Sequence, residues 1–230
     1  MTGEELNQFV RGLRISKDQI LREEAEMLFL NELAQNRIGA QVLFYGGTAL
    51  RLAYGSPRFS EDIDLLRTKP LRFLEFTRFA RSVEKKYSKW KLADIKDKRK
   101  TFFALYVISD EKLKHNFSLK IELHKAETKA RIDAHLILLK SAVSVAEPLL
   151  LVPSLVDLKR FKEDALKERK KARDVFDLWY ISQSLRVPFS LPSDGAYYTR
   201  REFENELRVF LPREYYKVID ELYERTAKKD

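Results

Sequence analysis

Apolar residues recur every three to four positions over several long segments of this chain, and that spacing is typical of amphipathic helices. The last helical segment is interrupted near Leu211 and Pro212, because proline cannot continue a helix. Ser154, directly after Pro153, is a candidate N-cap for the helix that follows it. The predicted helices cover residues 17–36, 71–90, 155–184 and about 200–228.

Shorter apolar runs between these helices predict strands. In residues 117–124 every second residue is apolar, so Lys120, Glu122 and His124 share the polar face. Turn-forming residues separate this run from residues 102–108, which favours a hairpin. The predicted strands cover residues 41–45, 62–66, 102–108 and 117–124, followed by a last β-like stretch at 143–152.

The order of these elements predicts an α+β fold, with a mixed sheet and helices followed by an all-helical portion. A chain of 230 residues is long enough for this arrangement. We place the boundary near Pro153, which divides the chain into a domain of residues 1–152 and a C-terminal domain of residues 153–230.

The composition is that of a globular protein that attracts polyanions. The net charge is +9, and nucleic acid is the commonest partner of such a surface. The chain has no cysteine, which excludes disulfides and thiolate zinc sites. It also has no apolar run of about 20 residues and no secretory signal at its polar N-terminus, so we expect a cytoplasmic protein without a membrane segment.

Two aspartates on one predicted strand form the strongest candidate site. Asp62 and Asp64 lie two residues apart and therefore point to the same face, where they could share Mg²⁺, with Mn²⁺ as the alternative ion. Isolated Asp-x-Asp pairs are often ordinary surface acids, but Asp64 lies between Ile63 and Leu65 and needs a partner cation.

A glycine-rich turn precedes these aspartates. Gly46, Gly47 and Thr48 open a predicted helix, whose free backbone N–H groups can receive a phosphate. A phosphate cradle close to two metal-binding acids suggests transfer of a nucleotidyl group from an NTP. Ser60 and Arg58, in the loop between them, could contact phosphate or brace the loop.

Transfer of this kind needs a third acid to share the metal and to accept a proton from the attacking hydroxyl. Glu122 is the best candidate because it lies on the polar face of its strand. The alternative is a surface glutamate paired with Lys120 or Lys125.

A second group of charges lies in the C-terminal helices. Asp174 and Asp177 share one face of an otherwise apolar helix, where salt bridges into the core are the alternative to a direct role. Residues 167–173 are rich in lysine and could be a solvated face or an RNA contact. The three histidines, His115, His124 and His135, lack the spacing of a metal site.

These motifs resemble the AbiEii/AbiGii-type nucleotidyltransferase toxins, the toxin half of type IV toxin–antitoxin systems. The resemblance covers about residues 44–180. The matching blocks are Gly46-Gly47-Thr48-Ala49-Leu50 with Arg58-x-Ser60-x-Asp62-x-Asp64-Leu65, then Lys120-Ile121-Glu122, and finally Lys162-x-x-Ala165 with Arg173-Asp174-x-x-Asp177-Leu178.

The resemblance implies a DNA polymerase β-like nucleotidyltransferase fold in which Asp62 and Asp64 hold Mg²⁺ and the glycine turn holds the NTP phosphates. It also implies that a lysine of the helix predicted over residues 155–184 meets the triphosphate and that Asp174 is essential. Lys159 and Lys162, one turn apart, are the two candidates for this lysine, and we choose Lys162 for its spacing to Ala165, Arg169 and Arg173. Some members of the family act on tRNA, and a cognate antitoxin protein is a further expected partner.

Three functions follow as hypotheses. The first is a Mg²⁺-dependent transferase that moves a nucleotidyl group from an NTP to RNA, with tRNA as the expected acceptor, and acts as a toxin. The second keeps this chemistry with a protein hydroxyl or a small molecule as acceptor. The third is a non-catalytic protein of the same fold that binds RNA or a partner, although its intact set of acids and lysine argues against it.

Overall fold

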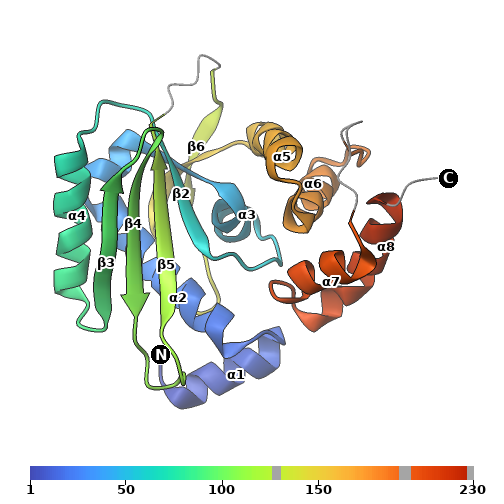
Figure 1. The fold of residues 1–230 in the computed structure, drawn as a ribbon, viewed down its shortest axis with the longest axis horizontal. Coiled ribbons are helices and arrows are strands. Elements are labelled where there is room, and N and C mark those ends of the chain that lie inside the picture. Colours follow the sequence, from blue (N-terminus) through green and yellow to red (C-terminus); the bar gives the residue numbers. More distant parts are fainter. Residues whose placement is uncertain (126–130, 192–197, 227–230) are drawn as a thin grey trace.

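A five-stranded mixed sheet forms the centre of the N-terminal part of the molecule (Figure 1). The computed structural model describes residues 1–125, 131–191 and 198–226. The strand order is β1-β2-β5-β4-β3, in which β2 and β5 are parallel and the other neighbours are antiparallel. The strands are β1 (Val42–Tyr45), β2 (Asp62–Arg67), β3 (Trp90–Asp97), β4 (Thr101–Ile108) and β5 (Phe117–His124).

The apolar face of this sheet is covered by two helices, α2 (Lys17–Gln35) and α4 (Phe73–Lys86). Phe29 of α2 contacts Phe79 of α4 edge to face, with ring centroids 5.5 Å apart, and lies 6.0 Å from Tyr106 of β4. The alternation predicted for residues 117–124 is confirmed, because the apolar side chains of β5 are buried and Glu122 is half-buried. The opposite face of the sheet is therefore free to carry polar chemistry.

The remaining elements follow around this sheet. A small antiparallel sheet of β6 and β7 packs against β1. Figure 1 shows the C-terminal helices grouped beyond β2 and α3, at the opposite end of the sheet from α4. The helices and strands not yet given bounds are α1 (Gly3–Leu13), α3 (Gly46–Tyr54), β6 (Ala134–Leu138), β7 (Leu149–Pro153), α5 (Leu155–Arg169), α6 (Ala172–Leu185), α7 (Arg200–Arg208) and α8 (Tyr216–Thr226).

The structure differs from the sequence prediction where tertiary contacts override local pattern. The predicted helix over residues 71–90 ends at Lys86, because Trp90 stacks on Tyr87 and starts edge strand β3. The helical pattern over 155–184 forms two helices, since Lys170 adopts a left-handed conformation with φ 48°. Strands β3 and β6 and helix α1 were not predicted, and of the β-like stretch over residues 143–152 only residues 149–152 pair as a strand, which continues to Pro153.

Other expectations are confirmed. Ser154 caps α5 by accepting a hydrogen bond from the Asp157 backbone N–H at 3.4 Å. The hairpin of β4 and β5 is present. The final helical segment is interrupted around Pro212, although its predicted last residues, 227–228, lie outside the described residues. No helix in the described ranges is both long and apolar enough to span a lipid bilayer.

The apolar interior consists of a large cluster within residues 6–152 and a second cluster within residues 166–222. A small group of Leu50, Leu158 and Ile181 packs α3 against α5 and α6. The division into domains of residues 1–152 and 153–230 stays a prediction.

A buried ion pair joins the loop before β2 to helix α6. Arg58 donates two hydrogen bonds to the Asp177 carboxylate, both at 2.7 Å, and its side chain is only 2% exposed. Lys162 of α5 lies 2.6 Å from the same carboxylate. Burial alone would raise the pKa of Asp177, but Arg58 and Lys162 outweigh burial and lower this pKa well below its usual range. The geometry therefore gives Arg58 the bracing role.

We predict that Asp177→Ala lowers the free energy of unfolding by about 3–5 kcal/mol, because the variant leaves a buried guanidinium without its counter-charge. Asp94→Ala is the control, since Asp94 pairs with Lys96 on the exposed strand β3 and should contribute at most about 1 kcal/mol. Urea unfolding followed by circular dichroism measures both values. Equal losses in the two variants would show that the buried pair does not brace the fold.

Candidate active site

The parallel pairing of β2 and β5 places polar side chains in three neighbouring rows. Asp62 lies opposite Lys120, Asp64 opposite Glu122, and Leu66 opposite His124. Residues two apart on a strand point to the same face. The pairing therefore brings the predicted third acid, Glu122, beside the Asp-x-Asp pair.

A cleft of about 400 Å³ opens between this part of the sheet and helix α5. The sheet side and the start of α3 contribute Tyr45, Gly46, Asp64, Leu66, Glu122 and His124. Helix α5 contributes Leu158, Phe161, Lys162, Asp164, Ala165, Glu168 and Arg169. Carboxylates and cations thus face each other across a space that also has apolar walls.

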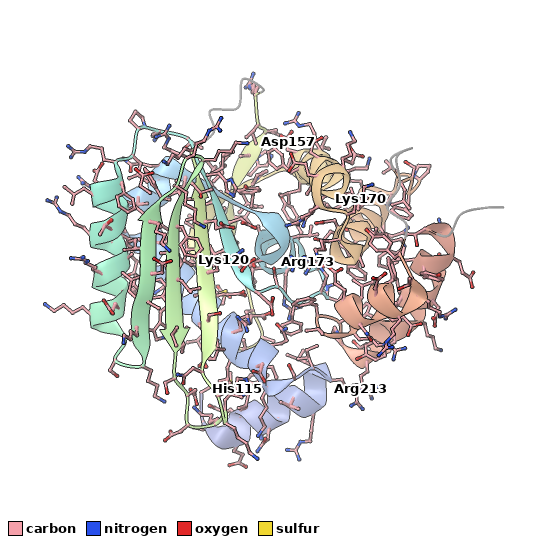
Figure 2. The ribbon with its side chains drawn as sticks, viewed as in Figure 1. His115, Lys120, Asp157, Lys170, Arg173 and Arg213 are labelled. Atoms are coloured by element: carbon pink, nitrogen blue, oxygen red, sulfur yellow. The ribbon has the colours of Figure 1, made fainter. Side chains whose placement is uncertain are left out.

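Lys120 balances the negative charge of the acids. Its ammonium lies 2.9 Å from the Asp62 carboxylate and 3.2 Å from that of Glu122. Burial alone would lower the pKa of Lys120, but the two acids outweigh burial and raise this pKa. The pairing of Glu122 with Lys120, considered above as an alternative, is therefore present in the structure. Figure 2 labels Lys120 on β5, near the middle of the molecule.

Asp64 is held against the first glycine of the turn. Burial, and secondly the charge of Asp62, raise the pKa of Asp64 above its ordinary value. Gly46 has a φ of +87°, and a Cβ atom at this position would lie 2.4 Å from Oδ2 of Asp64. Only glycine allows both this backbone conformation and this approach. The glycine thus determines where the Asp64 carboxylate lies.

The side chain of Thr48 is used within the fold, so the predicted phosphate role of the turn rests on its backbone N–H groups. Thr48 is fully buried, and its hydroxyl donates a hydrogen bond of 2.5 Å to the backbone carbonyl of Asp62. This hydroxyl anchors β2, and the backbone N–H groups of α3 are what the turn can offer to a phosphate. A Cβ at Gly47 would lie 2.4 Å from Nη2 of Arg58 and 2.9 Å from Oγ of Ser60, so this glycine makes room for both side chains.

The donor set in the cleft fits a divalent cation. Asp64, Glu122 and His124 each offer a ligand atom, and these atoms lie within 4.8 Å of one another. Carboxylate oxygen and imidazole nitrogen are ordinary ligands of divalent metals. The predicted set was Asp62, Asp64 and Glu122; the structure brings the last two together with His124 and places Asp62 alongside, paired with Lys120.

The two cations of α5 are held by Asp174. This carboxylate is fully buried; it accepts two hydrogen bonds from Arg169, at 2.7 and 2.8 Å, and lies 3.1 Å from Lys162. Burial alone would raise the pKa of Asp174, but Lys162 and then Arg169 outweigh it and lower the pKa. Asp174 does not line the cleft, so its contribution passes through these cations. Lys159 pairs with Glu163 instead.

Comparison with known proteins identifies the family. The model of the AbiEii nucleotidyltransferase toxins of type IV toxin–antitoxin systems matches residues 28–229. The chain belongs to this family. This AbiEii protein is therefore a nucleotidyltransferase, as its motifs predicted, and the predicted α+β nucleotidyltransferase fold is confirmed. A search of curated proteins by sequence finds no match.

Solved structures share the fold at low sequence identity. MenT4, a nucleotidyltransferase toxin from Mycobacterium tuberculosis, is 14% identical, with a TM-score of 0.67 over 99% of this chain and 89% of that one. JHP933 from Helicobacter pylori is 22% identical, with a TM-score of 0.55 over 74% of this chain and 68% of that one. At such identities the likeness concerns the fold alone.

Sequence reasoning about this AbiEii protein did not place His124 or Phe161 in the cleft, and it considered Arg169 only as part of the basic run of residues 167–173. The signal for His124 was its alternation with Glu122 on one strand face. No local signal marks Phe161, because it meets the sheet only through the packing of α5.

We predict that Gly46→Ala displaces the Asp64 carboxylate and weakens binding of divalent metal. Gly55→Ala is a matched control, because Gly55 also has a positive φ, of +75°, but its added Cβ would meet only the Tyr180 hydroxyl at 3.6 Å. Both variants should lose about 1–2 kcal/mol of stability from backbone strain. Calorimetric titration with Mn²⁺ should show weakened binding in Gly46→Ala alone, and equal affinities in both variants would contradict the close-approach argument.

Proposed function

We propose that this AbiEii-family protein transfers a nucleotidyl group from an NTP to RNA, with tRNA as the acceptor, and that the reaction depends on Mg²⁺ or Mn²⁺. The observation that carries the proposal is the convergence of Asp64, Glu122 and Lys162 on one cleft beside the helix-opening glycine turn. Such a site offers acids for a metal and cations for a triphosphate.

The acids of the sheet would hold the metal. Asp62 and Asp64 come from β2 and Glu122 from β5, and the bound cation would neutralise phosphate charge and align the triphosphate. Lys120 lies between the carboxylates of Asp62 and Glu122 and offsets part of their mutual repulsion. The conformation of the site is thus prepared before any cation arrives.

The chain supplies the proton transfer and the phosphate contacts. Glu122 would accept the proton of an acceptor hydroxyl, whose oxygen would bond to the α-phosphorus while pyrophosphate leaves. Lys162 and Arg169 line the cleft opposite the acids and would meet the departing phosphates. Asp174 orients both cations through its ion pairs. Gly47 lies at the start of α3 with the Ser60 hydroxyl of the loop before β2 beside it, and both would contribute phosphate contacts.

The basic surface next to the cleft supports an RNA acceptor. Lys170 and Lys171 are exposed in the turn between α5 and α6, directly after Arg169 of the cleft wall. Figure 2 labels Lys170 and Arg173 on these C-terminal helices. With a net charge of +9, the protein attracts polyanions generally, and these lysines would direct RNA toward the acids. The type IV family implies a cognate antitoxin as a partner. We further propose that the protein acts inside the cytoplasm.

The direct test is incubation with each labelled NTP, divalent metal and total RNA. We expect label in tRNA from the wild-type protein and a loss of more than about 100-fold in Asp62→Asn or Asp64→Asn, since even indirect partners of a metal site contribute 10–100-fold. Asp94→Asn, on the exposed edge strand, is the matched control and should retain activity. If the label appears on protein or on a small molecule instead, that molecule and not RNA is the acceptor. Undiminished activity in both aspartate variants would refute the metal assignment.

A second prediction concerns the basic turn. Charge reversal at Lys170 and Lys171 should raise the apparent KM for RNA while leaving that for NTP unchanged. In the charge-reversal variant, the plot of log K for RNA against log salt should become less steep, by about 1 for each phosphate that these lysines neutralise in the wild-type protein. Charge reversal at Arg81 and Lys85, exposed on α4 at the opposite end of the sheet, is the matched control. An RNA KM that is insensitive to salt, or an equal change in both double variants, would overturn the proposed role of the turn.

A further inference from the structure

His124 completes the polar rows that β2 and β5 form. It follows Glu122 by two residues on the same strand face, opposite Leu66 of β2. The side chain lines the cleft, and its ring lies edge to face against Tyr45, with centroids 5.9 Å apart. Packing between the strand and Tyr45 thus fixes the imidazole beside the acids rather than in open solvent.

The imidazole is close enough to share an ion with the acids. One ring nitrogen of His124 and one oxygen each of Asp64 and Glu122 lie within 4.8 Å of one another, so small side-chain shifts would bring all three around a single bound cation. Within the described ranges, this is the one cluster of three such ligand groups. Asp64 cannot withdraw toward α3, because Gly46 is already in contact with its carboxylate.

The ligand chemistry favours a transition metal. Mg²⁺ prefers oxygen ligands, whereas imidazole nitrogen suits first-row transition metals, and Mn²⁺ accepts both donor types. A site with two carboxylates and one imidazole therefore binds Mn²⁺ more tightly than Mg²⁺, whereas an all-carboxylate site would have more similar affinities for the two ions. Both ions suit nucleotidyl transfer, so the discrimination concerns which ion fills the site.

We propose that His124 is a direct metal ligand, together with Asp64 and Glu122, and that it makes this cleft select Mn²⁺ over Mg²⁺. This inference rests on the proposed metal-dependent transfer. It assigns a role to a residue that the predicted set of three acids omits. The other two histidines lie elsewhere, with His115 paired to Asp18 and His135 to Asp133.

The experiment is electron paramagnetic resonance of Mn²⁺ bound to the NTP-free protein. A directly coordinated imidazole couples its nitrogen to the bound Mn²⁺, and pulsed measurements detect this coupling. We expect the coupling in the wild-type protein and its loss in His124→Gln. The same variant should bind Mn²⁺ at least about 10-fold more weakly, the lower end of what supporting residues of metal sites contribute, while Mg²⁺ affinity changes little.

Two further variants keep the test decisive. His115→Gln is the matched control, because His115 lies at the turn of the β4–β5 hairpin, far from Lys120 in Figure 2, and should leave coupling and affinity unchanged. His124→Phe keeps a ring against Tyr45 and should also lose the coupling, which separates ligation from packing.

The outcomes distinguish this inference from the proposed function. Nitrogen coupling that persists without His124, or tight Mn²⁺ binding without any nitrogen coupling in the wild-type protein, overturns the ligand assignment and leaves metal-dependent transfer standing. A wild-type protein that binds neither Mn²⁺ nor Mg²⁺, with or without NTP, overturns both.

Discussion

The site depends on a buried network of four charges that connects three parts of the chain. Arg58 from the loop before β2, Lys162 from α5, and the two acids of α6 are linked by ion pairs and are almost fully buried. A buried charge is tolerated only with its partners in place. Removing one member would therefore leave a buried charge without its partner and destabilise the packing of α5 and α6, which forms one wall of the cleft.

Charge compensation also determines how the acids on the sheet side of the cleft are held. Asp62, Asp64 and Glu122 would repel one another without positive charge between them. Lys120 supplies that charge to two of these acids, and the raised pKa of Asp64 reflects its burial beside the carboxylate of Asp62. The site is therefore negatively charged and only partly neutralised, a state that favours a divalent cation. The cations of α5 then remain opposite, where a triphosphate would need them.

Local sequence pattern predicted the Asp-x-Asp face, the polar face of β5 and the helix cap at Ser154, because each of these depends on residues close together in the chain. It did not predict the pairing of β2 with β5, which places Glu122 beside Asp64 and is set by tertiary packing. The Arg58–Asp177 pair spans distant segments for the same reason. Edge strand β3, with charged residues facing solvent, lacks the apolar alternation that identifies a strand.

The central claim is that the cleft between β2, β5 and α5 binds a metal-bound NTP. The most direct test is a crystal structure with Mn²⁺ and a non-hydrolysable NTP analogue, in which anomalous scattering locates the ion. The account predicts the anomalous peak between the carboxylates of Asp64 and Glu122, with the triphosphate extending toward Lys162 and the start of α3. A peak elsewhere, or a nucleotide bound outside this cleft, would contradict it.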